Sequence, residues 1–370
     1  MKKIGVITTQ YAPNYGALLQ TFALQKFVGT QCDKGEIEAI DYNPPHVKEF
    51  WKIFPGGKGI RNLALNAYLM LNPKFIWEKK KRLNNFRRFI KENIACSNKY
   101  YTTEELESLE DRYHTVICGS DQIWNITRHD DPNWYLYFSK AWKNCKKIAY
   151  APSVADKIPQ GHEENLKKYL ENLDHISVRE DVDVEQLKAY TNKEIHHVCD
   201  PVFLLNEKEW EEYLPECPIK EPYILCYFIS TGDLASSVVE KMRELTGMKV
   251  VHVNVNIRDK FNADYDIRTA DPFEFASYVK NAAYVCTNSF HCTAFSILFK
   301  KNFVVVKKQT ANSRMESLIR SSGLEDRFVA KADVETLTVE KLETDYTNSK
   351  MDQFIADSKS YLLGAINSEK

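Results

Sequence analysis

The side chain best suited to proton transfer is His291, in the polar segment Thr287–Ser296 that follows an apolar run at 283–287. Ser289 can cap the apolar helix expected next, which would place His291 in its first turn. Imidazole titrates near neutrality, and the positive end of a helix attracts anions and disfavours imidazolium. The segment therefore predicts an acid–base group beside an anion-binding helix end. A histidine at such a position can also be a core residue.

A second polar segment, Gly119–Asn125, follows the apolar run 115–118 and contains Asp121. A carboxylate at the end of a strand can act as a base or bind sugar hydroxyls. In the alternative interpretation Asp121 caps the next turn and Trp124 packs in the core. The residues alone leave both interpretations open.

A third segment, Asn14–Gln20, follows the apolar run 3–8 and carries Gly16. A flexible glycine at the start of a helix can present backbone N–H groups to an anion or to a sugar hydroxyl. A plain strand-to-helix turn with a capping Asn14 would have the same sequence.

The fourth candidate is Arg179, which closes the apolar run 175–179. Its planar guanidinium can bind a carboxylate or a phosphate through two parallel hydrogen bonds. A surface ion pair between Arg179 and Glu180 is an equally good interpretation of this dipeptide.

The elements that must position these side chains are short apolar runs separated by helical-period stretches. Strands alternating with helices predict parallel sheets with helices on both faces. The runs expected to be strands are residues 3–8, 37–42, 115–118, 147–151, 175–179, 196–199, 223–229, 249–253, 283–287 and 303–307.

The length of 370 residues predicts about two domains. Asn206 can cap a helix over 207–214, and a proline-rich stretch then leads to a new first strand. We expect an N-terminal α/β domain over 1–205, a second over 206–335 and a helical tail over 336–370. Both are expected to be Rossmann-like, doubly wound domains that face a shared cleft, because such sheets bind ligands at the carboxyl ends of their strands.

Composition narrows the class of protein. Fifty basic and fifty-one acidic residues give a net charge of −1, which argues against a bulk nucleic-acid binder. The nine cysteines form no CxxC pair, and His196 and His197 near Cys199 fit no standard zinc spacing, so we expect no metal site. No apolar stretch approaches the ~20 residues of a membrane span. These features predict a soluble, reduced, cytoplasmic protein.

The stretch Lys74–Lys91 is unusually basic, with eight Lys or Arg among apolar side chains such as Leu83 and Phe86. One interpretation is an amphipathic helix that packs on the first domain and exposes its basic face to solvent. The other is peripheral contact with an anionic membrane surface at which a lipid-linked acceptor is held.

Taken together, these segments resemble the polysaccharide pyruvyl transferase family. No single motif is decisive, but their order and spacing match over roughly residues 1–325. The matching residues are Asn14-Tyr15-Gly16-Ala17 with Leu19-Gln20, Gly119-Ser120-Asp121-Gln122-Ile123-Trp124-Asn125, Ser177-Val178-Arg179-Glu180, Asp200-Pro201, Ser289-Phe290-His291 and Asn312-Ser313-Arg314.

The resemblance implies a fold like the GT-B glycosyltransferases and a donor, phosphoenolpyruvate, in place of a nucleotide sugar. The product in that family is a pyruvate ketal that bridges two hydroxyls of one sugar, as in exopolysaccharide, capsule or other cell-envelope precursors. No cofactor is implied, and the acceptor would be a sugar, with undecaprenyl diphosphate as its candidate carrier.

The resemblance also implies roles for individual residues. Many members carry Arg-Leu-His where this chain has Ser289-Phe290-His291, so another cation, Arg314 or Lys307, is expected to replace the missing arginine. The expected catalytic residues are His291 and Asp121. The expected donor-binding residues are Arg179, Ser289, His291 and Arg314. The expected acceptor-binding residues are Asn14, Tyr15, Gly16, Gln20, Asp121, Gln122, Trp124 and Asn125.

Two other functions are compatible with the same residues. One is a nucleotide-sugar glycosyltransferase, whose diphosphate would be bound by the loop Ser230–Asp233 after a strand. The other is a glycan-binding or assembly subunit that keeps the cleft without turnover.

Overall fold

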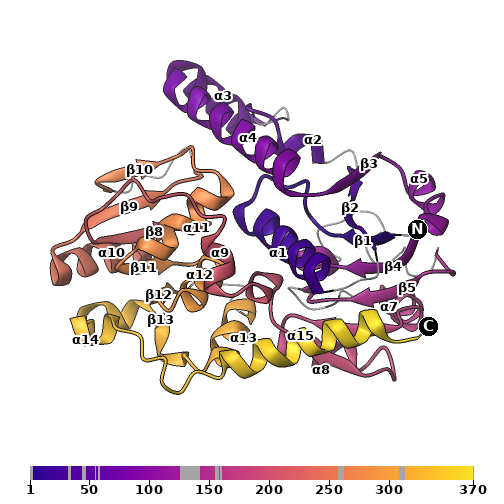
Figure 1. The fold of residues 1–370 in the computed structure, drawn as a ribbon. Helices are drawn as coiled ribbons and strands as arrows, with labels where there is room; N and C mark the ends of the chain where they lie inside the picture. The colour runs from indigo at the N-terminus through magenta and orange to yellow at the C-terminus, as the bar shows by residue number, and fades with distance from the viewer. Residues whose placement is uncertain are drawn as a thin grey trace.

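The computed structural model describes residues 3–31, 35–43, 47–54, 56, 59–125, 142–154, 158, 161–256, 262–307 and 313–369. Within these ranges the chain forms two α/β units, each built on one sheet (Figure 1). The strand order is β3-β2-β1-β4-β5-β6-β7 in the first sheet and β10-β9-β8-β11-β12-β13 in the second. Neighbouring strands pair in parallel throughout. The prediction of two doubly wound parallel-sheet domains is therefore confirmed.

The first sheet contains β1 Lys3–Ile7, β2 Ile37–Tyr42, β3 Cys96–Tyr100, β4 Tyr113–Cys118, β5 Lys146–Ala149, β6 His175–Val178 and β7 Ile195–His197. The second sheet contains β8 Tyr223–Tyr227, β9 Lys249–Val253, β10 Tyr265–Ile267, β11 Tyr284–Thr287, β12 Asn302–Val306 and β13 Phe328–Val329. The described helices are α1 Tyr15–Gln31, α2 Val47–Phe50, α3 Ile60–Leu71, α4 Pro73–Asn93, α5 Thr103–Glu107, α7 Glu163–Glu171, α8 Asp181–Leu187, α9 Glu207–Glu211, α10 Asp233–Thr246, α11 Pro272–Asn281, α12 Phe290–Leu298, α13 Ser313–Ser322, α14 Val339–Leu342 and α15 Met351–Asn367. None of these helices is both long and apolar enough to span a bilayer.

Every apolar run predicted to be a strand is one, with ends that differ by at most two residues. The strands that the sequence did not predict are β3, β10 and β13, and each lies at an edge of its sheet. An edge strand is covered on fewer sides, so it needs no continuous apolar run. In β3, for example, no residue is fully buried.

Each sheet has one point at which the strand order reverses, between β1 and β4 in the first sheet and between β8 and β11 in the second. Ligands of doubly wound sheets bind outside the carboxyl ends of the strands at this point. Three of the four predicted polar segments follow β1, β4 and β11, whereas Arg179 follows β6. The topology therefore directs most of the candidate residues to the reversal points.

Helix α1 is buried on nearly all sides because it packs between its own sheet and helices of the second domain, α11 and α12 (Figure 1). The ring of Phe22 in α1 lies 5.7 Å from that of Trp210, 4.9 Å from that of Tyr213 and 5.1 Å from that of Phe273, measured between centroids. One hydrophobic cluster thus continues from the first domain into the second.

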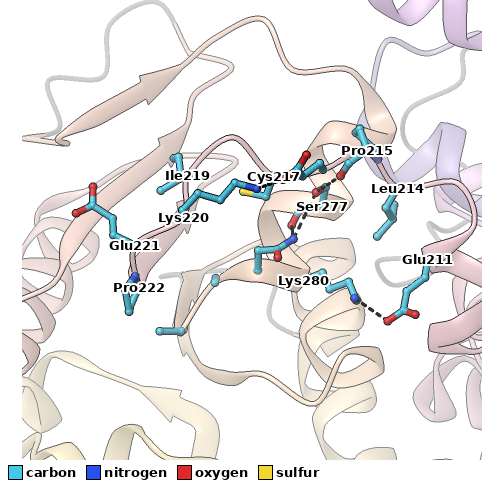
Figure 2. Close-up of a pocket in the computed structure, with 14 residues that line it drawn as sticks. Glu211, Leu214, Pro215, Cys217, Ile219, Lys220, Glu221, Pro222, Ser277 and Lys280 are labelled. Atoms are coloured by element: carbon cyan, nitrogen blue, oxygen red, sulfur yellow. Dashed lines mark hydrogen bonds and ion pairs between the residues drawn. The ribbon is translucent and has the colours of Figure 1, made fainter.

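The connection between the domains packs against α11. Asn206 caps α9 in a capping box with Glu209, and the helix ends at Glu211, earlier than predicted. Figure 2 shows the hollow beside the connection, where Ser277 Oγ donates a 2.7 Å hydrogen bond to the carbonyl of Pro215 and Lys280 pairs with Glu211 at 2.6 Å. The predicted boundary at residue 205 lies in the chain between β7 and β8, and it stays a prediction.

The tail crosses back to the first domain through α15. Lys146 at the start of β5 donates hydrogen bonds to the carbonyls of Ala365 and Ile366, and Ser358 accepts the N–H of Cys199. Helix α15 therefore stabilises the half of the first sheet that β5, β6 and β7 form.

Candidate functional site

A cavity of about 640 Å³ lies where the reversal points of the two sheets face each other. The first domain contributes the loops after β1 and β4, and the second contributes the loop after β8 and the starts of α12 and α13. The residues lining it are Thr9, Tyr11, Ala12, Pro13, Asn14, Ala17, Phe50, Asp121, Gln122, Ile229, Ser289, Phe290, His291 and Arg314. The hollow of Figure 2 lies instead at the amino ends of β8 and β11, where doubly wound sheets do not bind their ligands.

His291 reaches this cavity from the first turn of α12, as predicted. Ser289 is the N-cap residue, and its Oγ accepts the N–H of Cys292 at 3.5 Å. The imidazole lies against the backbone of Gly16 in α1, and a methyl group at that position would overlap the ring. The glycine is therefore required by the close approach of a side chain from the other domain.

The ring nitrogen Nε2 of His291 lies 3.5 Å from Oδ2 of Asp200, an ion-pair distance without hydrogen-bond alignment. A carboxylate at this nitrogen favours the tautomer with the proton on Nε2. Catalytic hydrogen bonds are often long before a substrate binds. Asp200 is thus placed to orient the imidazole.

Asp200 is itself fully engaged beneath the cavity. Oδ2 accepts from Ser120 Oγ at 3.1 Å and from Nη1 of Arg179 at 2.7 Å, and Oδ1 accepts the N–H of Val202 at 3.1 Å. Burial would raise the pKa of Asp200, but His291, Arg179 and the N–H of Val202 lower it well below its usual range. The carboxylate is therefore charged at neutral pH.

Arg179 is buried among carboxylates. Its Nε donates to Glu180 Oε1 at 2.8 Å. Its guanidinium lies 4.0 Å from the centre of the ring of Phe290, and that ring lines the cavity. Burial would lower the pKa of Arg179, but Glu180, Asp200 and Asp121 outweigh it, so the pKa is raised. The side chain does not line the cavity, and its predicted donor-binding role stays a prediction.

The buried cluster of Asp200, Arg179 and Glu180 extends to Asp183 in α8. Its Oδ2 accepts the N–H of Val154 at 2.9 Å. Burial, and next the carboxylate of Glu180, raise the pKa of Asp183 to about 9. At neutral pH Asp183 is therefore a neutral acid. The guanidinium of Arg179 then pairs with two carboxylates, those of Glu180 and Asp200.

Asp121 also lines the cavity, in an unusual backbone conformation with a φ of 76°. Left-handed φ values are strained for residues other than glycine and concentrate at functional sites. The Asp121 carbonyl accepts the N–H of Ser153, which fixes this turn. Within the described chain its carboxylate has no hydrogen-bond partner, so it is available to a ligand.

The cavity also contains two polar atoms without hydrogen bonds in the part of the chain that is described, Thr9 Oγ1 and Gln122 Oε1. Unpaired buried polar atoms are costly unless a ligand or water satisfies them. Three helices, α1, α12 and α13, begin at the cavity, and helix N-termini attract anions. Asn14 caps α1 by accepting the N–H groups of Gly16 and Ala17. This arrangement suits an anionic ligand with hydroxyl groups.

The structure brings together six of the predicted site residues, namely Asn14, Asp121, Gln122, Ser289, His291 and Arg314. The other acceptor candidates are buried nearby. Tyr15 stacks on Phe275 with centroids 4.6 Å apart and donates to the carbonyl of Ala270. Gln20 donates to Thr8 Oγ1 at 2.9 Å. The predicted binding roles of these two residues stay predictions, as do those of Trp124 and Asn125, which are also buried.

Lys307 and the loop Ser230–Asp233 lie outside the residues that line the cavity. Lys307 pairs with Glu316 at 3.5 Å, and Asp233 begins α10. Asn312, the first residue of the last matching segment, lies outside the described residues. The described chain contains no group of three or more His, Cys, Asp or Glu side chains arranged to hold a metal ion.

Sequence reasoning assigned no role to Asp200, Ser120, Glu180 or Phe290. Asp200 was recognised only as part of the segment Asp200-Pro201. The available indication was its place just after β7, at the same sheet edge as the other candidates. Contact with His291 could not be foreseen, because it crosses between domains.

Comparisons with known proteins agree with this picture. Residues 14–307 match the model of a protein family described as polysaccharide pyruvyl transferase. No curated protein matches the chain.

Among solved structures, UDP-GlcNAc 2-epimerase from Neisseria meningitidis bound to UDP-GlcNAc is similar, with a TM-score of 0.54 and 10% identity, over 99% of both chains. MnaA from S. aureus in a UDP co-structure has a TM-score of 0.53 and 13% identity, over 100% of this chain and 99% of its own. At this identity the likeness concerns the fold, which is GT-B-like as expected.

We predict that Gly16→Ala displaces the imidazole of His291. The variant should shift the imidazole NMR signals of His291, identified by their loss in His291→Gln, and overpacking should cost about 1–3 kcal/mol of stability. Gly29→Ala in the same helix is the matched control, because a methyl group there would make an ordinary 3.6 Å contact with Ile37. Unchanged His291 signals in Gly16→Ala would contradict the contact.

We also predict that Asp183→Asn makes stability less sensitive to alkaline pH. Because the pKa of Asp183 is raised to about 9 on folding, its contribution is complete below pH ~4 and is lost as the pH rises toward 9. The amide cannot lose a proton, so the variant should gain on the parent by up to ~1.4 kcal/mol per pH unit between pH 5 and 9. Urea unfolding across this range measures the difference. Parallel stability curves for parent and variant, like those expected for exposed Asp352→Asn, would refute it.

Proposed function

Because the chain belongs to the polysaccharide pyruvyl transferase family, we propose that it transfers the pyruvate group of phosphoenolpyruvate to a sugar as a cyclic ketal and releases phosphate. The observation that carries this proposal is the cavity that Asp121 and His291, oriented by Asp200, both line among three helix N-termini. It combines an acid–base group, a carboxylate without a hydrogen-bond partner among the described residues, and helix ends that attract anions, the three requirements of this reaction.

The reaction adds two sugar hydroxyls to one carbon of the donor. The methylene carbon of phosphoenolpyruvate gains a proton, the first hydroxyl adds to the central carbon, the bond to phosphate breaks, and the second hydroxyl closes the ring. One hydroxyl proton ends on the new methyl group and the other leaves with phosphate. No metal or cofactor is needed in this scheme.

Each step has a candidate residue in the cavity. His291 delivers the proton to the methylene carbon, and Asp200 acts on it as a positioning residue. Asp121 accepts protons from the acceptor hydroxyls. Arg314 and the N-terminus of α12 are the groups best placed to bind the phosphate and carboxylate of the donor. In this scheme Arg314 replaces the family arginine that is absent at Ser289.

The competing functions are separated by ligand. A thermal-shift experiment with phosphoenolpyruvate and a panel of nucleotide sugars distinguishes the donor of a pyruvyl transferase from that of a glycosyltransferase. Absence of phosphate release from phosphoenolpyruvate with every sugar and lipid-linked acceptor would favour a glycan-binding or assembly subunit.

The basic helical hairpin α3–α4 supports a proposal about the location of the protein. In this proposal the hairpin contacts an anionic membrane on which the acceptor is carried. Figure 1 shows the two helices side by side. Residues 60–91 hold nine Lys or Arg and a single acidic residue, Glu78. Six of the twelve exposed large apolar side chains in the described chain lie here, namely Ile60, Leu63, Tyr68, Met70, Leu71 and Trp77.

Part of the basic face of α4 serves the fold. Arg82 donates to the carbonyls of Asn254 and Val255, and Arg88 pairs with Asp271 at 3.5 Å. These contacts bind α4 to the second domain. Lys74, Lys80 and Lys81 stay exposed near the apolar side chains, a combination typical of helices that lie in a membrane interface.

The catalytic prediction is that His291→Gln lowers kcat by roughly 10²–10⁴-fold, the usual worth of a positioned proton donor. The melting temperature should hardly change, and phosphoenolpyruvate should still bind, because other groups provide its electrostatic recognition. Phosphate release and thermal unfolding are measured on the same samples, with exposed His162→Gln as control. Turnover within about threefold of the parent, far below the range for such a group, would remove His291 from this role.

The membrane prediction is that vesicles containing anionic lipid retain the protein at low salt and release it at high salt, because charge attraction is screened. At ~1 kcal/mol per lysine, changing Lys74, Lys80 and Lys81 together to Gln should weaken retention about 10²-fold. The control changes Lys167, Lys168 and Lys208 to Gln. Equal retention by neutral vesicles would contradict the proposal.

A further inference from the structure

A second cavity, of about 740 Å³, adjoins the first at the carboxyl edge of the first sheet. It lies beyond the ends of β1, β2 and β3, and Tyr11 lines both cavities. The residues lining it are Gln10, Tyr11, Asp41, Asn43, Val47, Lys48, Trp51, Arg87, Ile90, Lys91, Ile94, Cys96, Lys99 and Tyr101. Neither the family match nor the proposed reaction assigns any role to this space.

One end of this cavity is polar and contains a buried side-chain oxygen that accepts no hydrogen bond from the described residues. Gln10 is 1% exposed, and its Nε2 donates to the carbonyl of Ile40 at 3.1 Å and to Oδ1 of Asp41 at 3.4 Å. Its Oε1 has no hydrogen-bond partner within the described residues. Asn43 Nδ2 also donates to Oδ1 of Asp41, at 2.7 Å. An acceptor this deeply buried is satisfied by a donor such as a hydroxyl group.

Four cations and a single carboxylate line the cavity. Arg87 lies 4.9 Å from the centre of the Trp51 ring, and Lys48 lies 6.0 Å from that of Tyr101. In the described part of the chain, Lys48, Lys91 and Lys99 have no acidic partner within ion-pair distance. Since residues with like charge repel, an anionic ligand would be favoured here.

The other residues that line this cavity are apolar or aromatic. Trp51 is fixed by the hydrogen bond from its Nε1 to the carbonyl of Tyr11, 3.0 Å long. Ile90 and Ile94 of α4 contribute the facing aliphatic surface. Aromatic faces beside polar groups suit the C–H and O–H faces of a sugar ring.

We propose that this second cavity binds a further glycosyl unit of the acceptor, a hydroxylated ring that carries a phosphate or a carboxylate group. The inference rests on the proposed function, in which the first cavity holds the sugar that receives pyruvate. Hydroxyls of the second unit donate to Gln10 and Asp41, and its anionic group meets Lys91 and Lys99. The acceptor is then recognised by a charged unit next to the modified sugar.

The experiment measures binding directly and needs no turnover. Glucose 1-phosphate, glucuronate and uncharged glucose are titrated into the full-length protein without phosphoenolpyruvate and followed by saturation-transfer NMR. We expect one of the two anionic probes to bind more tightly than glucose, and the better probe identifies phosphate or carboxylate as the anion. The double variant Lys91→Gln/Lys99→Gln should weaken that probe about tenfold or more, since each charge-assisted hydrogen bond is worth ~1.5 kcal/mol or more.

The matched control is Lys167→Gln/Lys168→Gln on α7, which should leave binding unchanged. Absence of binding by both anionic probes, or equal binding by parent and double variant, would overturn the inference. These outcomes do not depend on phosphate release, so a failure of the proposed reaction is recognised separately. If transfer occurs, the double variant should raise the KM for the acceptor and leave the KM for phosphoenolpyruvate unchanged.

Discussion

The carboxylate of Asp200 is the group on which the geometry of the cavity depends. It is buried and charged, so it must be surrounded by donors and cations. Ser120 and Arg179 reach it from the first domain, and His291 reaches it from the second. Loss of Arg179 would leave this buried charge without its cation, a far larger cost than the net worth of an ion pair. The need to satisfy one buried carboxylate thus places the histidine beside it across the domain boundary.

Packing around this group makes the same arrangement rigid. Phe290 covers Arg179 from the cavity side, and Gly16 admits the imidazole so closely that no larger residue fits. Helix α1 continues from Gly16 into the hydrophobic cluster that both domains share. The walls of the cavity are therefore part of one core, and the strained turn at Asp121 is held in place by its own backbone hydrogen bonds.

The first domain presents several features along one sheet edge. The reaction cavity lies at β1 and β4, and the basic second cavity extends past β2 and β3. Helix α4 lines that second cavity with its C-terminal half and joins α3 through its other end. In a chain with a net charge of −1, the second cavity thus has an excess of positive charge, with four cations and one carboxylate among its lining residues. Local charge separation of this kind attracts an anionic substrate without making the whole surface basic.

The sequence by itself determined the parallel-sheet architecture, because central strands buried on both faces must be continuous apolar runs such as 223–227 and 303–306. It also determined the capping of α9 by Asn206 and of α12 by Ser289, since capping depends on side chains within a few residues of each other. The edge strands β3 and β10 escaped prediction, because an edge position requires little apolar surface.

Only the tertiary structure decided which polar residues share the cavity. In the sequence, Arg179 and Asp121 both follow apolar strands and were both candidate site residues. In the structure, Arg179 lies buried between two carboxylates, whereas Asp121 lines the cavity. The pairing of Asp200 with His291, and of Gly16 with the same ring, joins positions far apart in the chain. Such contacts depend on how two domains pack, and no local pattern of residue types encodes that packing.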